Sequence, residues 1–370
     1  MDNIFVVWTP LHVMNVLNLI VNHLEGKNNE IIIQNDLPKA DRYKEVLSLV
    51  CPNLNVTIAD AKKLKHESVI KKNYYLLSNR DIFNQKEYQN LYIPGDTFFT
   101  RLLFSIGKKK NPRMKLNYFE DGIGAYIYAD IINEVNIFDT LQCKLNPHSI
   151  FNYSFDTAFV YHPQYADQTK FKDIQKIPAM DDRNPSMAYT RKVFDMVYER
   201  ENIHINKSTI VYFDQPFWQD GSGICEKEVF EKFLQIIDRK DTDILIKMHP
   251  RSEEGKYQDV DILQTELPWE IFMLLNQNLP IIPVGINSTA IFSPTLIFGA
   301  LQPAILLASW LKNTPVTNLT EKSIKILNNT IGLVENLSID SIYLPQDTNQ
   351  LLNSIDNTIK MMEEEYEIET

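Results

Sequence analysis

The chain has little cysteine, which narrows the classes of protein it can belong to. It contains three cysteines in 370 residues, Cys51, Cys143 and Cys225, and these are widely separated. Disulfide scaffolds use paired cysteines, and zinc sites use closely spaced Cys or His residues. We therefore expect a protein of a reducing compartment, without disulfides and without a metal ion.

Positive charge is also scarce. There are 37 Lys and Arg residues against 48 Asp and Glu residues, a net charge of −11. General binding of nucleic acid depends on neutralising many phosphates with cationic side chains. No nucleic-acid partner is therefore expected.

Long apolar runs and glycine-rich fingerprints are missing as well. Residues 4–21 come nearest to an apolar run, but Pro10 and His12 interrupt it and no basic residues precede it. Neither a signal peptide nor a membrane span is expected there, so we predict a soluble, cytoplasmic protein. The sequence contains no GxGxxG, Walker A or HExxH motif, so no cofactor is expected.

What the chain does contain is an alternation of strand-like and helix-like segments. In the first half these are Asn3–Trp8, Leu11–His23, Glu30–Gln34, Ala40–Val50, Asn55–Ile58, the short apolar runs Tyr74–Ser78 and Asn90–Ile93, Phe98–Ile106 and Leu116–Phe119. In the second half they are Met187–Glu201, Thr209–Phe213, Glu226–Ile237, Ile244–Ile246, Pro280–Val284, Pro303–Ala308 and Leu351–Met362. This alternation predicts an α/β fold with doubly wound parallel sheets.

The length predicts two domains at roughly 150 residues each. The polar segment Asp181–Pro185 is the expected linker, which gives domains of residues 1–185 and 186–370. Between residues 125 and 205 the pattern is looser and predicts no strand.

Polar side chains follow the expected buried strand Ile244–Ile246. Lys247, His249 and Arg251 come directly after it. Ligands of open α/β sheets bind outside the carboxyl ends of the strands. Two cations and an imidazole suit a phosphate group there. A basic strand end on the surface, without any ligand, explains the pattern equally well.

Two further strand ends carry side chains that could take part in catalysis or ligand binding. Leu116–Phe119 leads into Glu120-Asp121-Gly122, a carboxyl pair suited to acid–base work or simply an Asp-Gly turn. Pro280–Val284 leads into Ser288-Thr289, whose hydroxyls could bind an anion at a helix start or only cap that helix.

Taken in order, these motifs resemble those of the bacterial sialyltransferases, and most closely glycosyltransferase family 52. The motifs that carry the resemblance are Glu120-Asp121-Gly122, Lys247 to Arg251 with its His249-Pro250 dipeptide, the helix start Pro268-Trp269-Glu270, and Ser288-Thr289. The resemblance implies a GT-B-like pair of Rossmann-type domains with the active site in the cleft between them. Residues 1–185 would face the acceptor, and residues 186–370 would bind the nucleotide-sugar donor.

The resemblance also implies roles for single residues. His249 would contact the leaving phosphate and would be surrounded by Lys247, Met248, Pro250 and Arg251. Trp269 and Glu270 would contact the cytidine or the ribose. Ser288 and Thr289 would form hydrogen bonds with the phosphate or with the carboxylate of the sialic acid. The general base is Asp220 or Asp121, with Asp220 slightly ahead, and Asp214 is a further candidate.

The implied reaction is an inverting, metal-independent transfer of sialic acid from CMP-sialic acid (CMP-Neu5Ac) to a terminal galactose, in α-2,3 linkage. The acceptor would be a lipooligosaccharide or capsule glycan, which is compatible with peripheral contact at the inner face of the cell membrane and with a homodimer. Other hypotheses are a GT-B enzyme or polyol-phosphate transferase with a UDP or CDP donor, and a non-catalytic binding protein.

One basic stretch stands outside these motifs. Lys108 to Arg113 carries four cations in six residues. Such a stretch is ordinarily a solvated loop. The alternative is contact with anionic lipid head groups, which attract clustered cations.

Overall fold

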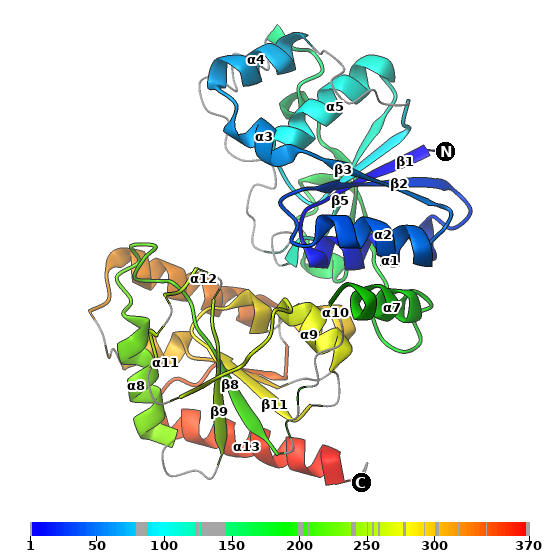
Figure 1. Cartoon of the computed structure of the whole chain (residues 1–370). Helices are drawn as coiled ribbons and strands as arrows, with labels where there is room; N and C mark the ends of the chain where they lie inside the picture. The colour runs from blue at the N-terminus through cyan, green and yellow to red at the C-terminus, as the bar shows by residue number, and fades with distance from the viewer. Residues whose placement is uncertain are drawn as a thin grey trace. The chain divides into compact units, whose positions relative to one another are not determined.

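A computed structural model of the chain separates it into two compact units, residues 1–200 and 201–370. The residues that it describes are 2–78, 87–122, 126, 145–198, 203, 205, 207–237, 242–249, 251–253, 255–257, 260–276, 279–291, 293–299, 303–314, 316, 318–337 and 339–367. Each unit is built on one parallel sheet with helices around it (Figure 1).

The sheet of the first unit has seven strands, in the order β3-β2-β1-β4-β5-β6-β7, and every pairing is parallel. The strands are β1 Asp2–Val7, β2 Asn28–Gln34, β3 Leu54–Ala59, β4 Asn90–Ile93, β5 Lys115–Phe119, β6 Phe155–Val160 and β7 Phe171–Lys176. The helices are α1 Pro10–His23, α2 Ala40–Val50, α3 Ala61–His66, α4 Val69–Ser78, α5 Phe98–Lys110, η2 Ile150–Asn152, η3 Pro163–Tyr165 and α7 Ser186–Tyr198.

The direction of strand order reverses between β1 and β4. Helices α1 and α2 therefore cover one face of this sheet, while α3, α4 and α5 lie on the other (Figure 1). Thr9 caps α1 by accepting a hydrogen bond from the His12 backbone N–H, and Pro10 occupies the first helical position. In open α/β sheets, ligands bind outside the carboxyl ends of the strands at such a reversal.

The second unit repeats this plan with six strands in the order β10-β9-β8-β11-β12-β13, again all parallel. The strands are β8 Thr209–Phe213, β9 Asp243–Lys247, β10 Asp261–Ile262, β11 Ile281–Gly285, β12 Ala304–Leu306 and β13 Ile342–Tyr343. The helices are α8 Glu226–Ile237, α9 Trp269–Leu275, η4 Thr289–Ile291, α10 Ser293–Phe298, α11 Ala308–Asn313, α12 Glu321–Leu337 and α13 Thr348–Glu367. Here the order reverses between β8 and β11.

The prediction of two doubly wound parallel sheets is confirmed, with differences at particular elements. β6 and β7 form in the stretch where no strand was expected. β7 is an edge strand with exposed Lys172, Asp173, Gln175 and Lys176, so its sequence lacks an apolar run. The apolar run Tyr74–Ser78 belongs to helix α4 and is not a strand.

The strand before His249 is parallel, as expected, but it is only partly buried. β9 lies second from the edge, and its outer neighbour β10 covers only Leu245 and Ile246. Ile246 is the one fully buried residue of β9.

Helix α7 packs with the first unit. Arg42 on α2 donates from Nε and Nη2 to the carbonyl oxygen of Met196, at 3.2 and 3.1 Å, and the hydroxyls of Tyr43 and Tyr198 lie 3.2 Å apart. The boundary between the compact units therefore falls after this helix in the chain, between residues 200 and 201. The expected linker, Asp181–Pro185, comes before the helix.

Candidate active site

At the carboxyl edge of the first sheet, Asp121 is paired with a histidine from helix α1. His12 Nε2 lies 2.8 Å from Asp121 Oδ1, and the backbone N–H of Trp8 donates to His12 Nδ1 at 3.3 Å. Because Nδ1 accepts that bond, the ring proton lies on Nε2 and is donated to the carboxylate. The His12 side chain is fully buried, while 44% of the Asp121 side chain is exposed. His12 therefore orients a carboxylate that remains open to solvent.

The adjacent Glu120 has the opposite environment. Its carboxyl is buried, accepts a hydrogen bond from the Tyr161 backbone N–H at 2.8 Å, and is bonded by the Tyr126 hydroxyl. Burial, which penalises the charged form, raises the pKa of Glu120 to about 8. Glu120 is therefore protonated at neutral pH, and Asp121 is the member of the pair that a substrate can reach.

In the second unit His249 follows the carboxyl end of β9, as predicted. The backbone N–H of Arg251 donates to His249 Nδ1 at 3.1 Å, so Nε2 carries the ring proton. Burial, reinforced by the nearby Arg251 guanidinium, lowers the pKa of His249 below its usual value. The imidazole is thus neutral at pH 7 and offers one N–H donor.

Asp220, the other candidate base, forms a forked ion pair with Arg251. Oδ1 and Oδ2 accept from Nη1 and Nη2 at 2.8 and 3.0 Å. These hydrogen bonds hold the pKa of Asp220 below its usual range. Both carboxylate oxygens are engaged with the cation, which makes this aspartate a weaker proton acceptor than an aspartate without such a pair.

Asp214, the third candidate, is buried in an ionic cluster. It accepts from Lys256 Nζ at 2.9 Å and the Tyr257 hydroxyl at 2.6 Å, and it is bonded by the Ser252 hydroxyl. Lys256 also reaches Glu226 at 2.5 Å. The Asp214 side chain has no exposed surface. Its contacts hold the loop that follows His249, and its carboxylate is closed to solvent.

The remaining donor-side candidates differ in whether their polar atoms have partners in the fold. Lys247 Nζ donates to the carbonyl oxygen of Leu267 at 3.2 Å, and Met248 packs on the apolar core of the unit, so both support the fold. Glu270 accepts from the Ser293 hydroxyl at 2.7 Å. Trp269 is buried between Phe213 and Phe272, yet its indole Nε1 has no hydrogen-bond partner among the described residues.

The segment after β11 is only partly described. The Ser288 carbonyl oxygen accepts from the Ile291 N–H at 3.2 Å, and Ser288 is half-buried. Thr289 begins the short η4 helix, and Pro250 lies outside the described residues. Beside them the backbone N–H of Asn287 donates to Gln215 Oε1 at 3.0 Å, which joins the ends of β8 and β11 at the reversal of strand order.

Sequence reasoning missed His12. A lone histidine on an apolar helix is ordinarily a core residue, and its partner lies 109 positions away. Its place just after the first strand was the available signal, because the carboxyl ends of parallel strands share one edge of the sheet.

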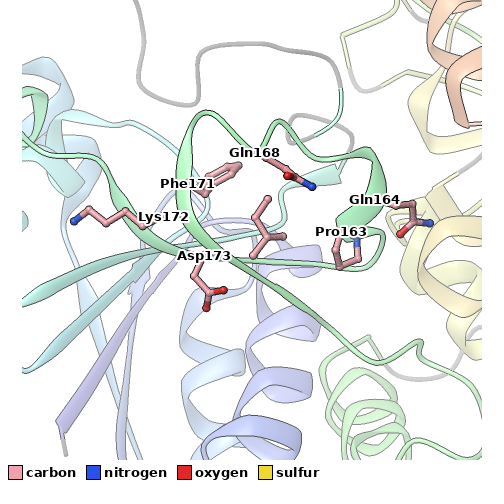
Figure 2. A pocket seen from close by; sticks show the side chains of 7 residues that line it. Pro163, Gln164, Gln168, Phe171, Lys172 and Asp173 are labelled. Carbon is pink, nitrogen blue, oxygen red and sulfur yellow. The ribbon is translucent and has the colours of Figure 1, made fainter.

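A hollow of about 480 Å³ opens on the first unit. Its lining comes from the β6–β7 connection and from β7, and includes Pro163, Gln164, Phe171 and Lys172 (Figure 2). None of the predicted site residues lines it. Among the residues that the structure describes, no three His, Cys, Asp or Glu side chains gather to hold a metal ion. Within the same residues, no helix combines the length and apolarity that crossing a bilayer requires.

A family profile described as "Alpha-2,8-polysialyltransferase (POLYST)" matches residues 3–304. The chain belongs to the alpha-2,8-polysialyltransferase family. This match confirms that it is a glycosyltransferase of a sialyltransferase family, as the sequence motifs implied. It spans both units and includes Asp121, Asp220 and His249.

Solved structures similar to this polysialyltransferase-family chain confirm its fold. UDP-GlcNAc 2-epimerase from Neisseria meningitidis bound to UDP-GlcNAc matches at 12% identity with a TM-score of 0.53, over 98% of this chain and 94% of that one. The UDP-GlcNAc 2-epimerase of Methanocaldococcus jannaschii, in complex with UDP-GlcNAc and UDP, matches at 12% identity and 0.50, over 97% and 93%. MurG of Acinetobacter baumannii aligns more weakly, at 8% identity and a TM-score of 0.46, over 98% and 93%, and adds no support for the fold. Comparison with curated proteins gave no match. The fold is a GT-B-like α/β architecture of two Rossmann-type units.

The burial of Glu120 predicts a specific pH dependence of stability. Its pKa is about 8 in the folded protein against 4.5 for the free side chain. Between these values the unfolded chain loses a proton that the folded chain keeps, so stability falls as pH rises, by up to about 1.4 kcal/mol per pH unit. Glu120→Gln keeps an acceptor for Tyr161 but removes the titration. We expect this variant to lose less stability than the wild type between pH 5.5 and 8, measured by urea unfolding.

The exposed Glu25→Gln is the matched control and should retain the wild-type pH slope. Equal slopes for wild type and Glu120→Gln would show that Glu120 is ionised in the fold.

Proposed function

We propose that this chain transfers sialic acid from CMP-sialic acid to the end of a bacterial surface glycan. The observation that carries the proposal is the family match over residues 3–304. The second unit supports it with a donor edge suited to phosphate. There the His249 Nε2–H and the Arg251 guanidinium follow the carboxyl end of β9.

The proposed base is Asp121, in the first unit. It would remove the proton from the acceptor hydroxyl as the oxygen attacks the anomeric carbon of the sialic acid. His12 supports this role because its Nε2–H fixes one carboxylate oxygen while the side chain stays 44% exposed. Asp220 is the second candidate, and its forked pair with Arg251 makes it the weaker one.

The proposed role of His249 is to assist the leaving group. The bond between sialic acid and phosphate breaks, and CMP departs with the electron pair. The Nε2–H of the neutral imidazole would donate a hydrogen bond to the phosphate oxygen. Since the nucleophile arrives opposite to CMP, the anomeric configuration is inverted. The reaction as proposed involves no metal ion or cofactor.

The nucleoside would lie near Trp269 and Glu270. The indole Nε1 of Trp269 is buried without a hydrogen-bond partner among the described residues, and a buried donor of this kind is costly unless a ligand accepts from it. A cytosine carbonyl or a ribose oxygen could fill this role. Ser288 and Thr289 are proposed to bond the phosphate or the carboxylate of the sialic acid.

Two acceptor ends are proposed. One is a terminal galactose of lipooligosaccharide or capsule, joined in α-2,3 linkage as in glycosyltransferase family 52. The other is a terminal sialic acid, joined in α-2,8 linkage, which the description of the matched family favours. The experiment is incubation with CMP-sialic acid and either lactose or an α-2,8-disialylated lactoside, with products read by mass spectrometry. If only the sialylated acceptor is extended, the result supports the α-2,8 reaction. If only lactose is extended, the result supports the α-2,3 reaction. No transfer to either, with UDP- or CDP-linked donors active instead, overturns the donor assignment.

The two candidate bases can be separated by matched substitutions. We expect Asp121→Asn to lower kcat by about 10²–10⁴-fold, because it removes the proton acceptor. Asp220→Asn should act mainly on KM for the donor, because it releases Arg251 beside His249. Steady-state kinetics measures both effects, and unchanged CMP affinity in Asp121→Asn shows that this variant is folded. A large loss of kcat in Asp220→Asn, with Asp121→Asn nearly as active as wild type, would move the base to the second unit.

Donor binding can be tested without turnover. A hydrogen bond to a charged group contributes about 1.5–3 kcal/mol, so His249→Ala should weaken CMP binding by roughly tenfold or more in calorimetric titration. The control is His162→Ala in the other His-Pro dipeptide, which lies in the first unit and should bind CMP as the wild type does. Tighter binding of UDP or CDP than of CMP would favour the rival donor classes.

A further inference from the structure

An unusually basic surface lies on helices α3 and α4. Residues 61–75 contain five lysines, at positions 62, 63, 65, 71 and 72, and one acidic residue, in a chain whose net charge is −11. Lys62, Lys63, Lys65 and Lys71 are exposed, and Lys72 is half-buried. Five of the 37 Lys and Arg residues thus lie within 15 consecutive positions of an acidic chain.

Two large apolar side chains project from the same helices. Ile70 is 83% exposed and Tyr74 is 56% exposed, and their spacing of four residues places them on one face of α4. Helix α4 is attached through other positions: Tyr75, together with Phe98, packs on buried Leu102 and Ile106 of α5.

Specific contacts hold the two helices in place. Asp60 caps α3 by accepting from the Lys63 backbone N–H at 3.1 Å. Lys72 Nζ donates to the carbonyl oxygen of Lys65 at 2.6 Å and lies 5.6 Å from the centre of the Phe98 ring. The Lys72–Lys65 hydrogen bond therefore links α4 to α3, and both helices lie beside α5 (Figure 1).

We propose that this surface, formed by Lys62, Lys63, Lys65, Ile70, Lys71 and Tyr74 and called here the α3–α4 face, docks on an anionic lipid bilayer. Lys71 Nζ is paired with Glu67 Oε1 at 2.5 Å, so the attraction rests mainly on Lys62, Lys63 and Lys65. These lysines match the negative potential of such a surface, and each gains attraction close to it. Ile70 and Tyr74 would enter the boundary between head groups and acyl chains, where aliphatic and amphipathic aromatic side chains are favoured. A soluble polyanion would use the lysines but would leave Ile70 in water, so the apolar pair favours a membrane.

The basic stretch singled out in the sequence, Lys108 to Arg113, is a poorer candidate. The Lys108 side chain is 8% exposed, donates to the Pro112 carbonyl oxygen at 3.2 Å, and lies over the rings of Phe104 and Tyr153.

The location of the α3–α4 face relates it to the candidate base. α3 begins just after the carboxyl end of β3, and Lys72 lies over Phe98, which opens α5 after the carboxyl end of β4. The carboxyl ends of parallel strands share one edge of the sheet, and Asp121 lies at that edge. A glycan carried on a lipid would thereby reach Asp121 from the bilayer. This last step rests on the proposed function, whereas the docking itself does not.

The test is flotation of the full chain with phosphatidylcholine vesicles, with and without phosphatidylglycerol. We expect binding only to the anionic vesicles, weakened by salt. Ile70→Ser with Tyr74→Ser, and separately Lys62→Glu with Lys63→Glu, should each lower the vesicle partition coefficient about tenfold or more. The matched controls are Leu49→Ser, an equally exposed apolar site at 68% on α2, and Lys109→Glu with Lys110→Glu on α5; both should bind as the wild type does.

Two results would overturn the proposal. One is wild-type vesicle binding by the variants of the α3–α4 face. The other is loss of binding in the lysine variant but not in the Ile70/Tyr74 variant, together with tight binding of soluble polyglutamate, which would make the face a polyanion site. Turnover of a soluble acceptor is measured on the same variants and should be unchanged. Failure of docking and failure of sialyl transfer are thereby told apart.

Discussion

The parallel arrangement of the strands is the constraint on which every candidate group depends. In each unit all carboxyl ends meet at one edge of the sheet, and the order of strands reverses once. Polar residues far apart in the chain are consequently brought together there. His12 and Asp121 are 109 positions apart and yet share a 2.8 Å hydrogen bond. Asn287 and Gln215 meet in the same way across the reversal in the second unit.

Burial and hydrogen-bond partners give the carboxylates at these edges different environments. Glu120 is enclosed and protonated, while its neighbour Asp121 is oriented by His12 and remains open. In the second unit Asp214 is hydrogen-bonded to Lys256 and Tyr257 in a buried cluster, and Asp220 is ion-paired with Arg251. A buried ion pair contributes little net stability, but breaking it leaves a costly unpaired charge. We infer that the Asp214 cluster keeps the segment after His249 in one conformation.

The sequence predicts those features of the structure that depend on neighbouring residues, and it predicts poorly those that depend on residues far apart in the chain. The end of β9 could be found because an apolar run and its polar successors are adjacent. β7 could not, because an edge strand with exposed Lys172 and Asp173 carries no apolar pattern. His12 carried only its position just after the first strand as a signal, because its partner is supplied by a distant strand. For Trp269 the resemblance suggested a nucleotide contact. The structure buries the ring, and its Nε1 has no hydrogen-bond partner among the residues that the structure describes.

The fold alone does not choose among chemistries. The same two-unit architecture occurs, at 12% identity, in UDP-GlcNAc 2-epimerases. What differs between such proteins is the set of side chains placed at the sheet edges, because the backbone of a doubly wound sheet supplies position but little chemistry. Here one edge offers a carboxylate held by a buried imidazole, and the other offers a neutral imidazole beside a guanidinium. In the proposed function the carboxylate would accept a proton, and the imidazole and the guanidinium would bind phosphate. Transfer of a sugar from a nucleotide requires both functions.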